Sequence, residues 1–154
     1  MANQVVLITG ASSGIGKSIG EFLAQKGYKV YGTSRNPKTT KANGIHFVAL
    51  DVTKVETITA AVEQIIAAEG KIDFLINNAG MGITGPIEEI PDAEIRKVFD
   101  TNYFGVINVI KAVLPFMRKQ GDGFIINITS IVGYMGLPYR GIYSATKGAL
   151  ELTT

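Results

Sequence analysis

The chain has 154 residues, of which 46% are hydrophobic and 18% are charged, and its formal net charge is +2. This composition predicts one soluble globular domain and excludes a disordered chain, and so small a charge argues against nucleic-acid or membrane-surface binding. The absence of cysteine excludes disulfides and cysteine-ligated metals, and we expect no metal site. Neither a signal-peptide pattern nor an apolar run of the ~20 residues that span a membrane is present, so we expect a cytoplasmic protein.

Short apolar runs alternate with helical patterns along the chain. This alternation predicts a parallel sheet built from βαβ units, in one domain over residues 1–154. The predicted strands are Val5–Thr9, Lys29–Thr33, His46–Leu50, Ile72–Ile76 and Gly123–Ile128. The predicted helices are Ile15–Lys26, Val55–Ala68, Ala93–Phe99, Phe104–Arg118 and one that begins near Ile142, and Arg35–Gly44 is expected to be an exposed loop.

The helical pattern of residues 148–154 stops without a capping residue or a C-terminal glycine. We therefore expect the chain to be the front part of a longer protein, truncated after its fifth strand. A parallel sheet that ends there would expose an apolar edge and face.

A glycine-rich turn, TGASSGIG from Thr9 to Gly16, joins the first strand to the first helix. Glycine allows the backbone to approach a pyrophosphate, whose charge is favoured at a helix N-terminus. The turn therefore predicts a dinucleotide site, with wider glycine spacing than usual. An alternative is a phosphate-binding loop of a nucleotide hydrolase, with Lys17 on phosphates and Ser18 and Asp51 on magnesium, but it explains nothing after residue 51.

Arg35 follows Ser34 at the end of the second strand, where a site for NAD would carry an acidic residue. An arginine offers charge-assisted hydrogen bonds to a 2′-phosphate, so the sequence favours NADP(H) over NAD(H). The alternative is a solvated loop arginine. Asp51 is placed to accept a hydrogen bond from an adenine amino group, or else to cap the helix that follows.

Polar residues gather in the later half of the chain. Asn77 and Asn78 end the fourth strand in the expected ligand crevice, where they could also satisfy neighbouring backbone groups. Asn102 begins a long helix and has helix capping as its alternative role. Tyr143 and Lys147 are four residues apart, which on a helix brings their Cβ atoms within about 5–6 Å, so Lys147 can stabilise the ionised Tyr143 phenol.

Five features in register, TGASSGIG, NNAG (Asn77–Gly80), Asn102, Ser130 and YSATK (Tyr143–Lys147), resemble the short-chain dehydrogenase/reductase family over essentially the whole chain. The resemblance implies a Rossmann-type, doubly wound, three-layer α/β fold and an NADP(H)-dependent oxidoreductase that transfers hydride between nicotinamide and a carbonyl or secondary alcohol. It makes Tyr143 the general acid or base, supported by Lys147. Ser130 would hydrogen-bond the substrate oxygen, and Asn102 would position a water beside Lys147.

The same resemblance implies the cofactor contacts and the partners. We expect a small-molecule carbonyl or alcohol substrate, a homodimer or homotetramer in the full-length form, and no nucleic-acid or membrane partner. The expected cofactor-binding residues are Gly10, Ser12, Ser13, Gly14, Ile15, Gly16, Ser34, Arg35, Asp51, Val52, Asn78, Ala79, Gly80, Tyr143 and Lys147.

The segments after the fourth strand and after Ser130 look most like the hydroxysteroid and retinol dehydrogenase-like branch of the family. Ile83, Ile131, Met135 and Leu137 could line an apolar substrate pocket or could be core packing. The family continues for two more strands and a substrate lid. A non-catalytic dinucleotide-binding fragment or sensor is therefore an alternative to the enzyme.

Overall fold

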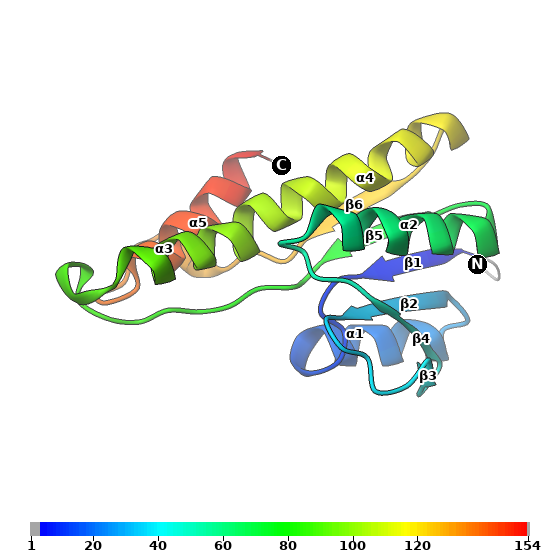
Figure 1. Ribbon diagram of the computed structural model, residues 1–154, viewed down its shortest axis with the longest axis horizontal. Helices are drawn as coiled ribbons and strands as arrows, with labels where there is room; N and C mark the ends of the chain where they lie inside the picture. The colour runs from blue at the N-terminus through cyan, green and yellow to red at the C-terminus, as the bar shows by residue number, and fades with distance from the viewer. Residues whose placement is uncertain (1–3, 154) are drawn as a thin grey trace.

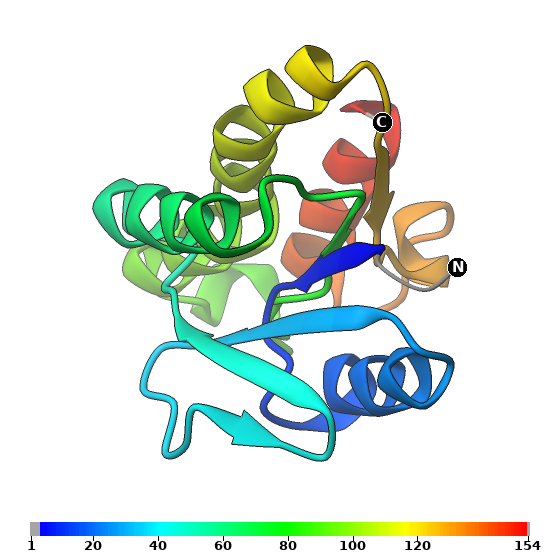
Figure 2. The ribbon, with the colours of Figure 1, turned by 90° about the vertical axis from the view of Figure 1, so that its right-hand side faces the viewer.

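The computed structural model describes residues 4–153, which form a six-stranded sheet with helices on both faces (Figures 1 and 2). The strand order is β3-β4-β2-β1-β5-β6, and every neighbouring pair is parallel except β3 and β4. The strands are β1 (Val5–Ile8), β2 (Lys29–Ser34), β3 (Lys41–Ala42), β4 (Ile45–Ala49), β5 (Phe74–Asn77) and β6 (Phe124–Asn127). This arrangement confirms the predicted doubly wound α/β fold.

Residues 4–153 also form five longer helices. Figure 2 shows α1 on the opposite side of the sheet from α2 and α4. The helices are α1 (Gly14–Gln25), α2 (Val55–Glu69), α3 (Asp92–Phe99), α4 (Gly105–Gln120) and α5 (Gly141–Thr153), with short turns η1 (Ile87–Glu89) and η3 (Ile131–Gly133) and a π-helical segment η2 (Asp100–Phe104).

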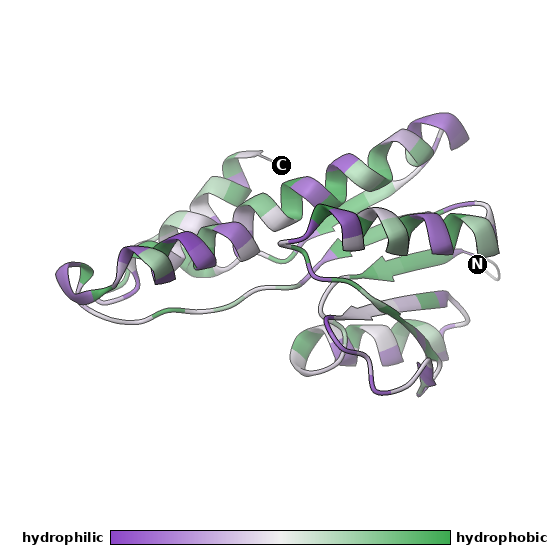
Figure 3. Cartoon of the chain, viewed as in Figure 1, coloured by the Kyte–Doolittle hydropathy of each residue, from purple (hydrophilic) through white to green (hydrophobic). Residues whose placement is uncertain are grey.

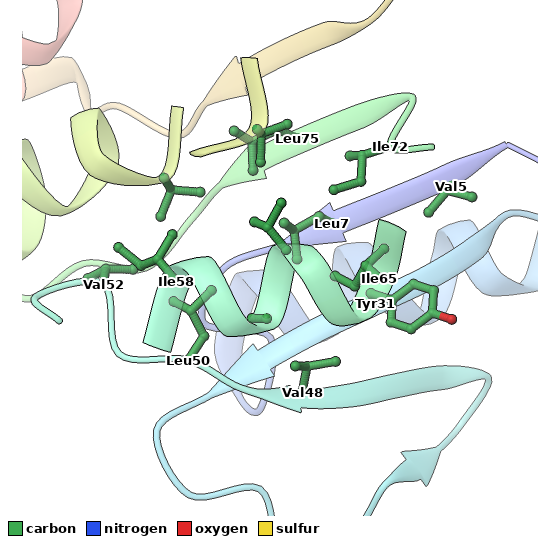
Figure 4. Close-up of a cluster of buried hydrophobic side chains, with 14 of the residues drawn as sticks. Val5, Leu7, Tyr31, Val48, Leu50, Val52, Ile58, Ile65, Ile72 and Leu75 are labelled. Carbon is green, nitrogen blue, oxygen red and sulfur yellow. The ribbon is translucent and has the colours of Figure 1, made fainter. Parts of the chain in front are cut away.

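The apolar run of β1 is continuous because both faces of the strand are covered. Val5 and Leu7 point into a cluster with α2 and α4, which Figure 4 shows in close-up, and Val6 and Ile8 point into a second cluster with α1. Each buried Val, Leu or Ile side chain contributes about 1.5–3 kcal/mol relative to exposure. The two clusters therefore fix the central strand, whose carboxyl end leads directly into the glycine-rich turn.

Two predictions differ from the structure by more than one or two residues at the end of an element. The predicted loop Arg35–Gly44 contains the short strand β3, which pairs antiparallel with β4. The sixth strand in chain order, β6, is therefore the one predicted as the fifth. The helix predicted to start at Phe104 instead continues without a break from α3 through η2 into α4. Asn102 consequently lies inside a helix, and its proposed capping role is wrong.

The outer strand β6 has a partly uncovered face. Phe124 is 59% exposed and Ile126 is 44% exposed, whereas the same face of β5 buries Ile76. In Figure 3 the strand β1 is hydrophobic along its length and β2 is more mixed, while α2 and α4 alternate between hydrophobic and hydrophilic residues. Among residues 4–153, no helix combines the length and the apolar character needed to cross a membrane.

Candidate active site

The glycine-rich turn is built by close backbone packing. Gly10 has a φ of +67°, and a Cβ there would lie 3.0 Å from the Cα of Ala79. A Cβ at Gly16 would lie 2.3 Å from Asn78 Nδ2 and 2.6 Å from the Gly10 carbonyl oxygen. Only glycine fits both positions, so these two residues fix how the turn enters α1.

The NNAG segment braces this turn. The Thr9 hydroxyl accepts hydrogen bonds from the backbone N–H groups of Asn78 and Ala79, each at 3.0 Å. The Asn78 side-chain amide donates to the carbonyl oxygens of Thr9 and Gly10, also at 3.0 Å. The predicted backbone-satisfying role of Asn78 is therefore confirmed. Its side chain holds the shape of the turn.

A pocket of about 500 Å³ opens beside the turn, between the carboxyl end of β2 and the hairpin of β3 and β4. It is lined by Ser12 and Ser34, two of the predicted cofactor residues, and by Lys17 and Lys38. Glu21 also lines the pocket and its Oε1 lies 3.8 Å from Lys17 Nζ, so the Lys38 ammonium group and the two hydroxyls are the groups that suit an anion. Ser13, Gly14 and Ile15 lie exposed at the N-terminus of α1. The pocket and the helix N-terminus together fit the phosphate-bearing half of a dinucleotide.

Arg35 and Asp51 lie next to this pocket. Burial acts to raise the pKa of the Asp51 carboxyl, but hydrogen bonds from Thr53 and the charges of Arg35 and Lys54 outweigh it and hold the pKa below its ordinary value. Asp51 Oδ1 accepts from Thr53 N and Oγ1, so it closes a local turn and does not cap α2.

Val52, which was predicted near the adenine, is buried in the core. A Cβ on Gly105 would lie 2.8 Å from Val52 Cγ2, so the side chain packs under the start of α4.

Asn102 joins three segments of the chain. Its side chain is fully buried, with Oδ1 accepting from Met81 N and Nδ2 donating to Met81 O, both at 2.8 Å. Nδ2 also donates to the hydroxyl of Thr146 at 3.1 Å. The side chain of Asn102 therefore fixes the loop after β5 against α5.

Tyr143 and Lys147 lie on consecutive turns of α5, as the spacing predicted. Lys147 is only 5% exposed, and burial lowers the pKa of its ammonium group. Its Nζ lies 6.0 Å from the centre of the Tyr143 ring and donates to the Ile128 carbonyl oxygen at 2.8 Å. The Arg140 guanidinium also lies 6.0 Å from the Tyr143 ring centre. Two cations therefore flank the candidate acid.

Lys147 also reaches the cofactor side of the site. A Cβ at Gly80 would lie 3.4 Å from Asn102 Oδ1 and 3.7 Å from Lys147 Nζ. Three predicted residues from three separate segments are thus brought together at one point.

Ser130 stands at the start of η3, two residues after the carbonyl that Lys147 binds. Its Oγ accepts a 3.4 Å hydrogen bond from Val132 N, which leaves the hydroxyl proton available to another acceptor. η3 packs directly on α5, since a Cβ at Gly133 would lie 3.1 Å from the backbone carbon of Lys147. The turn with Ser130 and the helix with Tyr143 and Lys147 are thus in backbone contact.

Sequence reasoning missed several residues that shape this site. Thr9 and Thr33 orient the glycine turn through their hydroxyls, and Thr146 receives the Asn102 amide. Gly133 and Gly148 allow η3 to approach α5. Their partners are distant in the chain or are backbone atoms, so no local pattern marks them.

Comparisons with known proteins agree with this geometry. A family model described as short chain dehydrogenase matches residues 4–154. The chain is 51% identical over 151 residues to 3-ketodihydrosphingosine reductase of Bacteroides thetaiotaomicron, covering 98% of this chain and 56% of that protein. It is 37% identical over 166 residues to human 17-beta-hydroxysteroid dehydrogenase type 1, covering 98% of this chain and 50% of that protein. The chain thus spans about half the length of the curated relatives it matches.

Solved structures agree as well. A short-chain dehydrogenase from Streptomyces avermitilis superimposes with a TM-score of 0.93 at 36% identity, covering 99% of this chain and 58% of that one. ElxO with NADP bound superimposes with a TM-score of 0.92 at 33% identity, covering 99% of this chain and 65% of that one.

The phosphate-binding-loop alternative fails on these observations. Lys17 Nζ lies 3.8 Å from Glu21 Oε1, and Ser18 Oγ donates to the Gly14 carbonyl oxygen of its own helix. The match to the dehydrogenase family also extends far past residue 51, where that alternative explained nothing.

Proposed function

Because the chain belongs to the short-chain dehydrogenase family, we propose that it is an oxidoreductase that interconverts a carbonyl and a secondary alcohol with NADP(H). The observation that carries the proposal is the position of Lys147. Its buried ammonium group lies beside the Tyr143 ring and next to Gly80, in the loop that braces the glycine-rich turn. The candidate proton donor therefore lies next to the loop that supports the proposed dinucleotide-binding turn.

The roles of the side chains follow from their hydrogen-bonding capacity. NADP(H) would supply or accept the hydride, held by the N-terminus of α1 and by the pocket with Ser12 and Ser34. In reduction, the Tyr143 hydroxyl would donate its proton to the carbonyl oxygen of the substrate, and in oxidation the phenolate would take a proton back. The Ser130 hydroxyl, whose proton is free to donate, would stabilise charge on the same oxygen.

Lys147 would favour the phenolate of Tyr143. Its Nζ lies 6.0 Å from the centre of the Tyr143 ring, and a unit charge at that separation contributes about 3 kcal/mol at an effective dielectric constant of ~20. Asn102 would act indirectly, because its amide is bound to Met81 and Thr146. A water placed beside Lys147 remains part of the proposal for Asn102.

The preference for NADP(H) over NAD(H) is supported by positive charge at one end of the site. Lys17 and Lys38 line the pocket, and Arg35 is close enough to Asp51 to affect its carboxyl. Lys17 is paired with Glu21, so a 2′-phosphate would meet Arg35 and Lys38 there, whereas a free 2′-hydroxyl gains little from them.

We also propose that the substrate carries an extended apolar chain. The most similar of the relatives described above is named 3-ketodihydrosphingosine reductase. Ile131, Met135 and Leu137, which follow Ser130, are each at least 44% exposed beside the site. Exposed apolar side chains next to the candidate acid suit an apolar substrate better than a charged one.

The test is NADPH consumption by the parent chain and by Tyr143→Phe. We expect the parent to oxidise NADPH with 3-ketodihydrosphingosine faster than with a short water-soluble ketone. Tyr143→Phe should abolish turnover while leaving NADPH affinity by calorimetry within about twofold, since only the proton donor is lost. Retained turnover in Tyr143→Phe would contradict the mechanism. NADPH binding without consumption by the parent would favour a dinucleotide-binding protein that is not an enzyme.

A further inference from the structure

We propose that Thr146, a residue in none of the assigned roles, positions the catalytic helix by linking Asn102 to the backbone of Tyr143. The inference rests on the proposed function, because it assigns Tyr143 and Lys147 to the reaction. It adds a residue whose part is to set where those two side chains stand.

The Thr146 hydroxyl both donates and accepts a hydrogen bond. The side chain is fully buried in α5, between Tyr143 and Lys147 in the chain. Its Oγ1 donates to the Tyr143 carbonyl oxygen at 2.8 Å and accepts from Asn102 Nδ2 at 3.1 Å. The local half of this pair is common for threonine in a helix, but the second half crosses to another segment 44 residues away.

The Asn102 amide, at the other end of the link, also has hydrogen-bond partners for its nitrogen and its oxygen. Both N–H groups of the Asn102 amide are used, one on the Met81 carbonyl oxygen and one on Thr146, and its oxygen accepts from Met81 N. A chain of hydrogen bonds therefore runs from the loop after β5, through the π-helical segment η2, to the carbonyl of Tyr143. Such buried networks hold a geometry only when every member is satisfied.

The link ends at the place where position matters most. Tyr143 and Lys147 lie on the consecutive turns of α5 that Thr146 joins, and the Lys147 amine lies near Gly80 on the proposed cofactor side. Without the hydroxyl, one N–H of Asn102 would be buried with no acceptor. We expect α5 or η2 to shift until that N–H reaches another acceptor. A displacement of about 1 Å in a reacting geometry reduces turnover by about a hundredfold.

Three variants separate positioning from packing. Thr146→Val keeps the shape and removes the hydroxyl, and Thr146→Ser restores the hydroxyl and removes a methyl group. Thr59→Val is the matched control, because the Thr59 hydroxyl donates within its helix to the Val55 carbonyl oxygen on the exposed face of α2. If Thr146→Val does not fold, Thr146→Ala takes its place in both measurements below.

The first measurement is the split between kcat and KM. We expect Thr146→Val to lower kcat about tenfold, a smaller loss than for a 1 Å shift, with the KM for NADPH unchanged. Thr146→Ser and Thr59→Val should stay within about twofold of the parent in both constants. Parent-like kcat in Thr146→Val, or an equal loss in Thr146→Ser, would overturn the positioning role.

The second measurement does not depend on turnover. In protein labelled with 13C at the tyrosine Cζ, the Tyr143 resonance is identified by its loss in Tyr143→Phe. It should move in Thr146→Val and should keep its parent position in Thr146→Ser and Thr59→Val. An unmoved Tyr143 resonance in Thr146→Val would refute the link even if the parent proved inactive. A moved resonance in an inactive parent would support the link and reject the proposed function alone.

Discussion

Gly133 and Gly148 meet backbone to backbone where η3 lies against α5. A Cβ at Gly148 would lie 3.1 Å from the Gly133 carbonyl oxygen, and one at Gly133 would lie 3.2 Å from Gly148 N. Neither neighbour is the end of a flexible side chain, so an added methyl group would push the two segments apart. The contact therefore sets the distance between the turn of Ser130 and the helix of Tyr143 and Lys147.

Gly148→Ala should lower turnover without unfolding the protein. Alanine favours a helix over glycine by about 1 kcal/mol, which offsets part of the strain of separating η3 from α5. We expect kcat to fall about tenfold and the thermal midpoint to change by a few degrees. The matched control is Gly141→Ala, because nothing lies within 4 Å of a Cβ at Gly141 in the same helix. Equal kcat values for the two variants would mean that the approach of η3 to α5 has no catalytic role.

Arg35→Asp should change the cofactor preference. Hydrogen bonds to charged groups contribute about 1.5–3 kcal/mol, so the affinity for NADPH should fall about 10- to 100-fold. The affinity for NADH should stay the same or rise, because a carboxylate can accept from the ribose 2′-hydroxyl. Calorimetric titration of each cofactor measures both values. Arg118→Asp, on the exposed last turn of α4, is the control for the change in net charge. An unchanged ratio in Arg35→Asp would make Arg35 a solvated loop residue.

Tyr31 and Glu69, a pair far from the candidate active site, are expected to make the free energy of unfolding depend on pH. The Tyr31 hydroxyl donates to Glu69 Oε1 at 2.5 Å, and Lys29 Nζ lies 3.2 Å from the same oxygen. The hydrogen bond from Tyr31, joined by Lys29, holds the pKa of the Glu69 carboxyl below its ordinary value of 4.5, although burial acts the other way. Burial and then Glu69 raise the pKa of Tyr31 to about 12.

The directions of these two pKa shifts predict two pH ranges in which the fold loses stability. A depressed carboxyl pKa stabilises the fold above pH 4.5, and this contribution is lost as the pH falls through the lower folded value. A raised phenol pKa stabilises the fold below pH 10, and this contribution is lost as the pH rises from 10 to about 12. Denaturant titrations across pH should show both losses in the parent.

Substitutions identify the pair. Glu69→Gln should reduce the loss of stability at acidic pH. Tyr31→Phe should reduce the loss at alkaline pH, and it should lower the free energy of unfolding at pH 7 by about 1.5 kcal/mol. Glu63→Gln, at an exposed position of the same helix, should leave the shape of the curve unchanged. A Glu69→Gln variant that keeps the full acid loss would show that other carboxyl groups cause it.

The sequence predicted the strands and helices well where the apolar pattern was strong. β1 is apolar at every position because two clusters cover it, and the period of α2 reflects one buried face. The strand β3 was missed because it has only two residues, Lys41 and Ala42, at the end of a polar segment. Asn43 and Gly44, at φ values of 48° and 82°, are an Asn-Gly pair, which is a strong hairpin signal, and they could have revealed it.

The candidate site was predictable only where residues act through short spacings. Tyr143 and Lys147 could be paired from their separation along one helix. The π-helical segment that joins α3 to α4 around Asn102 could not be predicted, because such a segment uses the same residue types as the α-helix around it. Thr146 could not be recognised either, since its partner amide lies 44 residues earlier and its significance comes from the fold.

The brace between Thr9 and Asn78 has a consequence for the order of folding. These residues are 69 positions apart, so the glycine-rich turn cannot take its shape until β5 has joined β1. On a ribosome, the turn would emerge early and would stay unformed until the residues of β5 have also emerged. A dinucleotide would then bind only after this long-range pairing, and at a hundred times its Kd it would stabilise the folded chain by about 2.7 kcal/mol. The supply of cofactor in the cell would therefore influence how much of the newly made chain stays folded.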